Sequence, residues 1–148
     1  MDAAEKAVVE NALSILDRHL KAKSHALVSP EAVRAFLRLK LERQESEVFA
    51  MLFMDAKHRV IEYRELFFGT IDSASVYPRE IVKASLLLNA AAVILVHNHP
   101  SGESYPSNAD RVLTQRVKDA LALVDVRVLD HLVVGHAEIT SLAEMGWC

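Results

Sequence analysis

Three short segments rich in apolar residues set the strongest limit on the folds open to this chain. They span residues 48–54, 91–96 and 126–134. The first two are almost wholly apolar, and runs of that length predict strands buried on both faces of a sheet. Such a sheet needs helices to cover it, because exposed apolar faces are unfavourable in water.

Helical patterns occupy segments between these strands. Over residues 3–20, apolar residues recur at intervals of three and four, as in an amphipathic helix. Ser29, Pro30 and Glu31 then provide an N-cap, a proline for the first turn and an acidic residue near the helix start. The predicted helices cover residues 3–20, 30–41, 78–89 and 108–123.

The order of these segments predicts the architecture. A polar turn at residues 55–58 joins the first apolar strand to residues 59–68, its predicted antiparallel partner. Hairpin and crossover connections both occur, so we expect an α/β fold with a mixed sheet flanked by helices. The 148 residues suit one ordinary domain. We predict that residues 45–148 form this domain and that residues 1–44 form a helical segment packed on it.

The charge distribution bears on nucleic-acid binding. The net charge is −3, which weakens an interpretation as a general DNA or RNA binder, because such proteins usually carry a basic excess. One short segment nevertheless concentrates basic residues. Two interpretations stay open: a solvated helix face, which is the common one, or a contact with phosphate or an acidic partner. The residues are Arg34, Arg38, Lys40 and Arg43.

The cysteine content and the amino terminus indicate the compartment. Cys148 is the single cysteine, so no disulfide can form within the chain. The first residues are acidic and lead into no apolar segment of the kind found in signal peptides. The longest apolar run, residues 90–96, falls far short of a membrane span. We therefore expect a cytoplasmic protein without a membrane partner.

The most informative residues follow the second apolar strand. His97 and His99 stand two positions apart, so both side chains project to the same side of the sheet. Pro100 then forces the chain to turn, and Asp110 lies in the first turn of the next predicted helix. Two imidazoles and one carboxylate suit zinc and leave a fourth position for water, as in catalytic zinc sites. A structural zinc normally has four protein ligands and is disfavoured.

Each part of this pattern also has an ordinary explanation. Ser107 and Asp110 have the spacing of a helix capping box, in which the acid serves only the backbone. Two histidines near each other are often incidental, since imidazoles make ordinary hydrogen bonds. Their combination with a buried strand, a turn and an acid on the next helix favours a metal site. His131, inside the third apolar segment, is either a core histidine or a partner of the metal ligands.

The spacing of His97, His99, Ser107 and Asp110 resembles the JAMM motif of JAB/MPN-type metalloproteases. The chain resembles the RadC family of bacterial proteins more closely, over about residues 45–147. This resemblance implies the JAB/MPN α/β fold, which is similar to that of the cytidine deaminases. Full-length RadC proteins also carry an N-terminal helix-hairpin-helix portion, for which 148 residues leave no room. The matching segments are 69–72, 78–80, 97–102 and 130–131.

The resemblance also implies roles for individual residues. His97, His99 and Asp110 take the place of the zinc ligands, and Ser107 that of a serine that stabilises the oxyanion. Glu47, just before the first core strand, matches the acid that deprotonates the attacking water. The implied activity is that of a zinc-dependent metalloprotease or isopeptidase acting on a protein or peptide.

Alternatives to this interpretation stay open. Without the resemblance, Glu47 is better explained as part of the solvated end of a helix, together with Glu42 and Glu45. Glu80 is a second candidate for the base, but its place near a helix start already accounts for it. Arg79 beside it is either structural or a substrate contact.

Two alternative functions stay open for the whole chain. A base or nucleotide deaminase is disfavoured, because the Pro-Cys-x-x-Cys half of that zinc site is absent. The other is a non-catalytic RadC-type binding module associated with DNA repair. The intact set of metal-ligand residues argues against it, since a scaffold does not need them.

Overall fold

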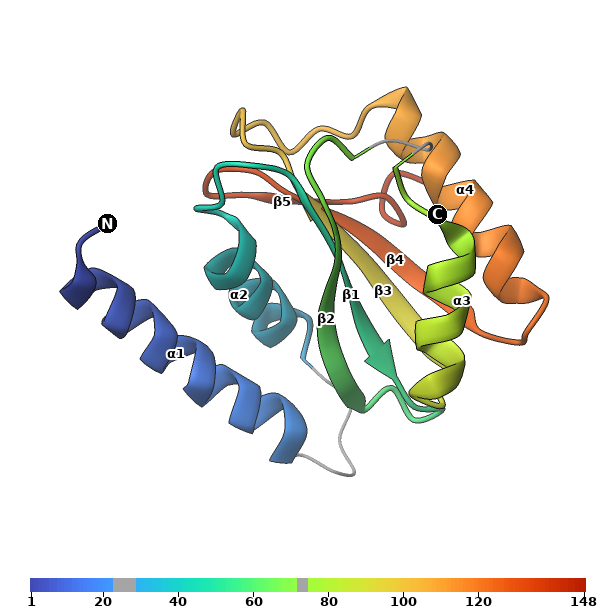
Figure 1. Cartoon of the computed structure of the whole chain (residues 1–148), viewed down its shortest axis with the longest axis horizontal. Helices are drawn as coiled ribbons and strands as arrows, with labels where there is room; N and C mark the ends of the chain where they lie inside the picture. Colours follow the sequence, from blue (N-terminus) through green and yellow to red (C-terminus); the bar gives the residue numbers. More distant parts are fainter. Residues whose placement is uncertain (23–28, 72–74) are drawn as a thin grey trace.

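The computed structural model describes residues 1–22, 29–71 and 75–148. In this part of the chain a five-stranded sheet, ordered β2-β1-β3-β4-β5, is covered by helices on both faces (Figure 1). The strands are β1 (Val48–Met54), β2 (Val60–Phe68), β3 (Ala92–Asn98), β4 (Arg127–Val134) and β5 (Ile139–Ser141). The helices are α1 (Ala3–Ala22), α2 (Pro30–Leu41), α3 (Pro78–Leu87) and α4 (Asn108–Ala122).

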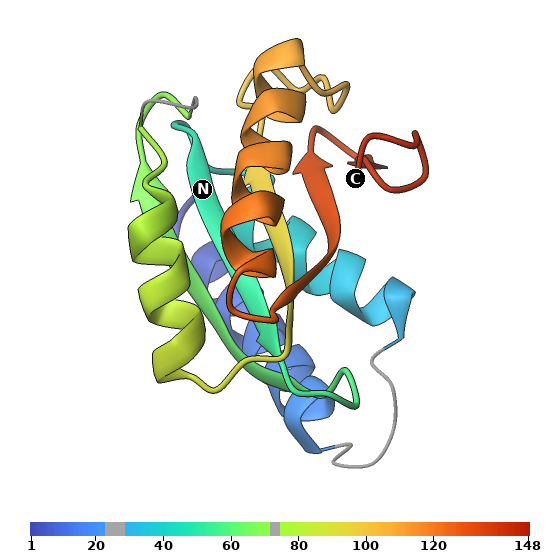
Figure 2. The same cartoon turned by 90° about the vertical axis from the view of Figure 1, so that its right-hand side faces the viewer.

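The sheet is mixed, as predicted. β1 pairs antiparallel with both β2 and β3, and β5 pairs antiparallel with β4. β3 and β4 are parallel, and the connection between them contains α4, because parallel neighbours need a crossover. Figure 2 looks onto the face that α3 and α4 cover, with α1 and α2 behind the sheet.

Strand β1 supplies apolar side chains to two separate cores. Phe49, Met51 and Phe53 pack among residues of α3 and α4, whereas Ala50 and Leu52 pack against α2. Every residue of β1 is buried, which confirms the prediction of a strand covered on both faces. The alternation of side chains along a strand therefore places one apolar set in each layer.

Three predicted boundaries were wrong by two residues, and one of them is that of α1, which ends at Ala22 rather than at residue 20. β3 continues past the predicted end at residue 96 to Asn98, so His97 lies within the strand. α3 ends at Leu87 rather than near residue 89. Asn89 has a φ of 51°, and a left-handed residue of this kind ends a helix.

The amino-terminal helix α1 packs less closely than the other helices. It lies against α2 and β2, and its described side chains are exposed or half-buried. Within the described ranges, none of the helices combines the length and the apolar character that a bilayer crossing requires. Residues 30–41 contribute to the core beside β1, but a division of the chain at residue 44 stays a prediction.

Phe53 tests how far stability depends on the layer between β1 and α4. Phe53→Ala should lower the free energy of unfolding by about 3–5 kcal/mol, because it opens a cavity at a fully buried position. Chemical denaturation would measure the change. Leu123→Ala is the control, since Leu123 is 87% exposed and should change stability by about 0.5 kcal/mol or less. Equal effects of the two substitutions would contradict this assignment of the core.

Candidate metal centre

The carboxyl end of β3 presents the two histidines. His97 is fully buried, and His99 follows the strand with its N–H donating to the carbonyl of Val134, at the end of β4. The Nε2 atoms of the two rings lie 3.0 Å apart. The two side chains thus converge on the same side of the sheet.

The start of α4 brings the carboxylate to them. Ser107 and Asp110 form a reciprocal capping box, in which each side chain accepts a hydrogen bond from the backbone N–H of the other. Asp110 Oδ1 lies 3.2 Å from His97 Nε2, and Asp110 Oδ2 lies 3.3 Å from His99 Nε2. Asp110 therefore serves the helix end and faces both imidazoles at once.

The separations of these atoms fit a zinc ion. Zinc binds imidazole nitrogen and carboxylate oxygen at about 2.0–2.2 Å, so two ligand atoms of a tetrahedral site lie about 3.3 Å apart. The two imidazole nitrogens lie 3.0 Å apart, and the two oxygens of Asp110 lie 3.2 Å from His97 Nε2 and 3.3 Å from His99 Nε2, respectively. One ligand atom from each residue lies within 4.8 Å of the other two. These residues form a candidate metal-binding group whose donor set suits zinc.

The charges of the group also favour a cation. Burial acts to raise the pKa of Asp110, but hydrogen bonds from His97 and His99 outweigh it and hold that pKa far below its usual value. The carboxyl group is thus ionised. The hydrogen bond to Asp110 raises the pKa of His99, with a smaller contribution from the charge of Glu47.

The loop after β3 fixes the orientation of His99. Its Nδ1 lies 2.9 Å from the carbonyl oxygen of Glu103, which can only accept a hydrogen bond. Nδ1 therefore carries the hydrogen, and in the neutral ring Nε2 keeps its lone pair for a metal. The loop folds back at Gly102, where φ is 95° and a Cβ atom would lie 2.5 Å from the ring of His136. Gly135 approaches the same loop, since its Cβ would lie 2.5 Å from the carbonyl oxygen of Gly102.

Glu47 lies immediately before β1, beside the metal-binding group. The antiparallel ladder between β1 and β3 ends at the pair Phe49–His97, and Glu47 lies two residues before Phe49. Its charge helps to raise the pKa of His99. The Glu47 side chain is half-buried, and its Oε2 accepts a hydrogen bond of 2.8 Å from the N–H of Ile71. The other carboxyl candidate, Glu80, pairs with Arg79 at 3.8 Å on α3. Arg79 is 90% exposed, and a role in substrate contact stays a prediction.

Ser107 has the capping role that its spacing indicated. Its Oγ accepts from the N–H of Asp110 at 3.1 Å, and this bond does not use the hydroxyl hydrogen. The exposed hydroxyl can therefore donate to another group while the cap stays in place. The capping box and a second role for Ser107 are compatible.

Asn98, between the two histidines, was missed because a loop was predicted to begin there. It is a buried strand residue whose Oδ1 accepts from the N–H of Val48 at 2.7 Å. Its Nδ2 donates to the carbonyl of Ser46 at 3.0 Å. Both neighbours of Glu47 are thus tied to the residue between the histidines. A prediction that the buried strand continues past His97 would have been needed to expect these contacts of Asn98.

His131, for which two interpretations were open, is both a core residue and a neighbour of the metal-binding group. It is fully buried in β4, and burial lowers the pKa of its ring. Its Nε2 lies 2.8 Å from His97 Nδ1, and its Nδ1 is hydrogen-bonded to Thr114 on α4. Both nitrogens of the ring therefore have partners.

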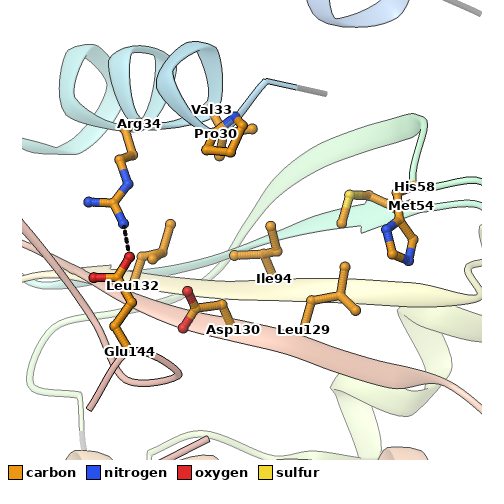
Figure 3. A pocket seen from close by; sticks show the side chains of 10 residues that line it. All are labelled: Pro30, Val33, Arg34, Met54, His58, Ile94, Leu129, Asp130, Leu132 and Glu144. Atoms are coloured by element: carbon orange, nitrogen blue, oxygen red, sulfur yellow. Dashed lines mark hydrogen bonds and ion pairs between the residues drawn. The ribbon is translucent and has the colours of Figure 1, made fainter. Parts of the chain in front are cut away.

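A pocket of about 440 Å³ lies on the other face of the sheet, between α2 and strands β3 and β4 (Figure 3). An ion pair of 3.0 Å between Arg34 and Glu144 crosses it. None of the five candidate site residues lines this pocket. Two more residues of the basic segment also have partners: Arg38 pairs with Glu42, and Lys40 lies over the ring of Tyr63. Three of the four basic side chains of this segment therefore have partners within the chain.

Comparison with known proteins agrees with this fold, which is that of a JAB-type α/β domain. The family model of the RadC-like JAB domain matches residues 27–147. The chain therefore belongs to the RadC family.

Its relatives include several bacterial proteins that carry the name UPF0758 protein. One from Ectopseudomonas mendocina is 58% identical over 147 residues, which cover 97% of this chain and 66% of that protein. One from Vibrio cholerae is 56% identical over 143 residues, which cover 97% of this chain and 90% of that protein. One from Marinobacter nauticus is 56% identical over 144 residues. The chain thus spans slightly less than two thirds of the length of some relatives and most of the length of others.

Asn98→Ala tests the connection between β3 and the segment that carries Glu47. It removes the partners of the Val48 N–H and the Ser46 carbonyl, so the free energy of unfolding should fall by about 1–3 kcal/mol. Asn108→Ala, at the exposed start of α4, is the matched control and should change it by about 0.5 kcal/mol or less. Denaturant titration would compare them, and an Asn98→Ala variant as stable as the control would refute the connection.

Proposed function

We propose that this chain is a zinc-dependent hydrolase that cleaves an amide or isopeptide bond in a protein or peptide. The observation that carries the proposal is the separation of 3.0–3.3 Å between the facing donor atoms of His97, His99 and Asp110. These separations are close to the edge of a tetrahedral zinc site, about 3.3 Å. Three protein ligands leave one position for water, as catalytic zinc sites do.

The three ligand residues would hold the ion, with Asp110 supplying the negative charge. Bound zinc would supply a water whose pKa is lowered to about 7 and a Lewis acid for the scissile carbonyl. His97 and Asp110 are buried, whereas His99 is half-buried at the mouth of the site. Substrate would therefore approach from the side of His99.

Glu47 is the proposed general base. It lies two residues before Phe49, the partner of His97 in the β1–β3 ladder, and so at the same end of the sheet as the proposed ligands. It would accept a proton from the attacking water and deliver it to the nitrogen of the leaving amine. The hydrogen bond from the Ile71 N–H holds one carboxylate oxygen and so orients the other.

Ser107 is the proposed oxyanion donor. While its oxygen caps α4, its hydroxyl hydrogen is available for the carbonyl oxygen of the substrate as negative charge develops there. A donor of this kind typically contributes about 2.7–4 kcal/mol to the stability of the transition state.

The rival functions have weaker support. A deaminase of the usual type needs cysteine ligands, and the single cysteine, Cys148, lies at the end of the chain. For a DNA-binding module the basic segment is the main candidate surface. The intramolecular partners of Arg34, Arg38 and Lys40 make that surface less available to phosphates.

Metal analysis tests the ligand set. The purified protein should hold one zinc per chain, and His99→Ala should lose most of it, because two ligands remain. His58→Ala is the matched control, since His58 contacts Arg127 and not the group. Elemental analysis after dialysis would give the stoichiometry. A full equivalent of zinc in His99→Ala would exclude these three residues as the ligands.

Glu47→Gln tests the general base. The amide keeps an oxygen for the Ile71 N–H, so zinc content should be unchanged while turnover falls by about 10²–10⁴-fold. Glu45→Gln, at an exposed position nearby, should keep full turnover. Cleavage of a panel of peptide and isopeptide substrates, with and without a chelator, would measure this. Undiminished, chelator-sensitive cleavage by Glu47→Gln would remove Glu47 from the mechanism.

A further inference from the structure

We propose that His131 is a positioning residue: together with Thr114 it fixes which nitrogen of His97 carries hydrogen, and so directs a lone pair at the metal. The inference rests on the proposed zinc site and extends it to two residues that have no role in the mechanism above. It follows from the directions of three consecutive hydrogen bonds.

The first bond fixes the hydroxyl hydrogen of Thr114. The Thr114 Oγ1 lies 2.7 Å from the backbone carbonyl oxygen of Asp110, one helical turn earlier in α4. A carbonyl oxygen can only accept, so the hydroxyl must donate to it. Bonds of this kind are common for threonine within helices. The single hydrogen of Thr114 is thereby committed.

The second bond therefore runs from His131 to Thr114. Thr114 has no second hydrogen to donate, so its oxygen accepts from His131 Nδ1. Both residues are fully buried in the contact between α4 and β4. The hydrogen of the neutral His131 ring therefore lies on Nδ1, and its Nε2 has a lone pair.

The third bond determines which nitrogen of His97, a proposed metal ligand, carries hydrogen. His131 Nε2 lies 2.8 Å from His97 Nδ1, and an Nε2 without hydrogen must accept. His97 therefore carries a hydrogen on Nδ1. In the neutral ring, its Nε2, which faces His99 and Asp110, then has the lone pair that zinc would take in place of the hydrogen bond to Asp110. The opposite direction would put a hydrogen where the ion must bind.

The chain of bonds begins and ends at the same residue. The Asp110 carbonyl accepts from Thr114 and so fixes the direction of all three hydrogen bonds. The Asp110 carboxylate faces His97 Nε2, the nitrogen at the other end of this series. The edge of the His131 ring also packs on Phe49, with ring centroids 5.9 Å apart. Among the described residues no buried side-chain nitrogen or oxygen lacks a hydrogen-bond partner.

Substitution of Thr114 separates this role from simple packing. Thr114→Val keeps the volume but removes the acceptor for His131 Nδ1, so zinc affinity should fall by about 10–100-fold, as is typical when a partner of a metal ligand is lost. Thr114→Ser restores a hydroxyl and should bind zinc almost as tightly as the native protein. Val117→Ala, at a buried position in the same helix, should lower stability without changing zinc affinity. Competition with a chromogenic chelator would give the affinities.

Nitrogen NMR of histidine-labelled, zinc-free protein tests the tautomers directly. In the native chain we expect hydrogen on Nδ1 of both His131 and His97, and in Thr114→Val a shift of His131 hydrogen to Nε2. Val117→Ala should retain the native tautomers. Hydrogen on Nε2 of His131 in the native protein, or unchanged zinc affinity in Thr114→Val, would overturn the proposal. Since this NMR measurement needs neither zinc nor substrate, its result is independent of whether the chain is a hydrolase.

Discussion

The antiparallel pairing of β1 with β3 is the contact on which the candidate site depends. It sets Phe49 opposite His97, so that Glu47, two residues before Phe49, lies at the same end of the sheet as the two histidines. A shift of one residue would turn the histidines to the other face of the sheet, because side chains alternate along a strand. The two buried cores oppose such a shift, since β1 contributes alternate residues to both of them.

The parallel pairing of β3 with β4 completes the arrangement. A parallel pair requires a crossover, and here the crossover carries α4, whose first turn lies at the carboxyl end of β3. The capping box then orients the Asp110 carboxylate as part of ending the helix. The same local interaction that begins the helix thus orients a candidate metal ligand, and the two explanations of the Ser107–Asp110 spacing do not compete.

Local patterns predicted the buried strands, most helix boundaries and the three residues that converge. His97 and His99 are close in sequence and share a strand, and Asp110 has a recognisable helix-start spacing. The roles of Asn98 and of the His131 contacts were not predictable in this way. Asn98 binds a residue 50 positions away, and His131 meets its partners over 34 and 17 positions. Such contacts depend on strand order, which no single segment encodes.

The loop between His99 and α4 is tightly constrained at one glycine, whereas the neighbouring positions are exposed. Gly102 has a φ of 95°, which favours glycine, and Gly135 has no room for a side chain against the Gly102 carbonyl, whereas Ser101 and Glu103 are exposed. The backbone path is thereby constrained at one point, while the adjoining side chains face solvent. Natural variation at Ser101 or Glu103 would therefore alter the surface of the loop beside His99 and leave its backbone path in place.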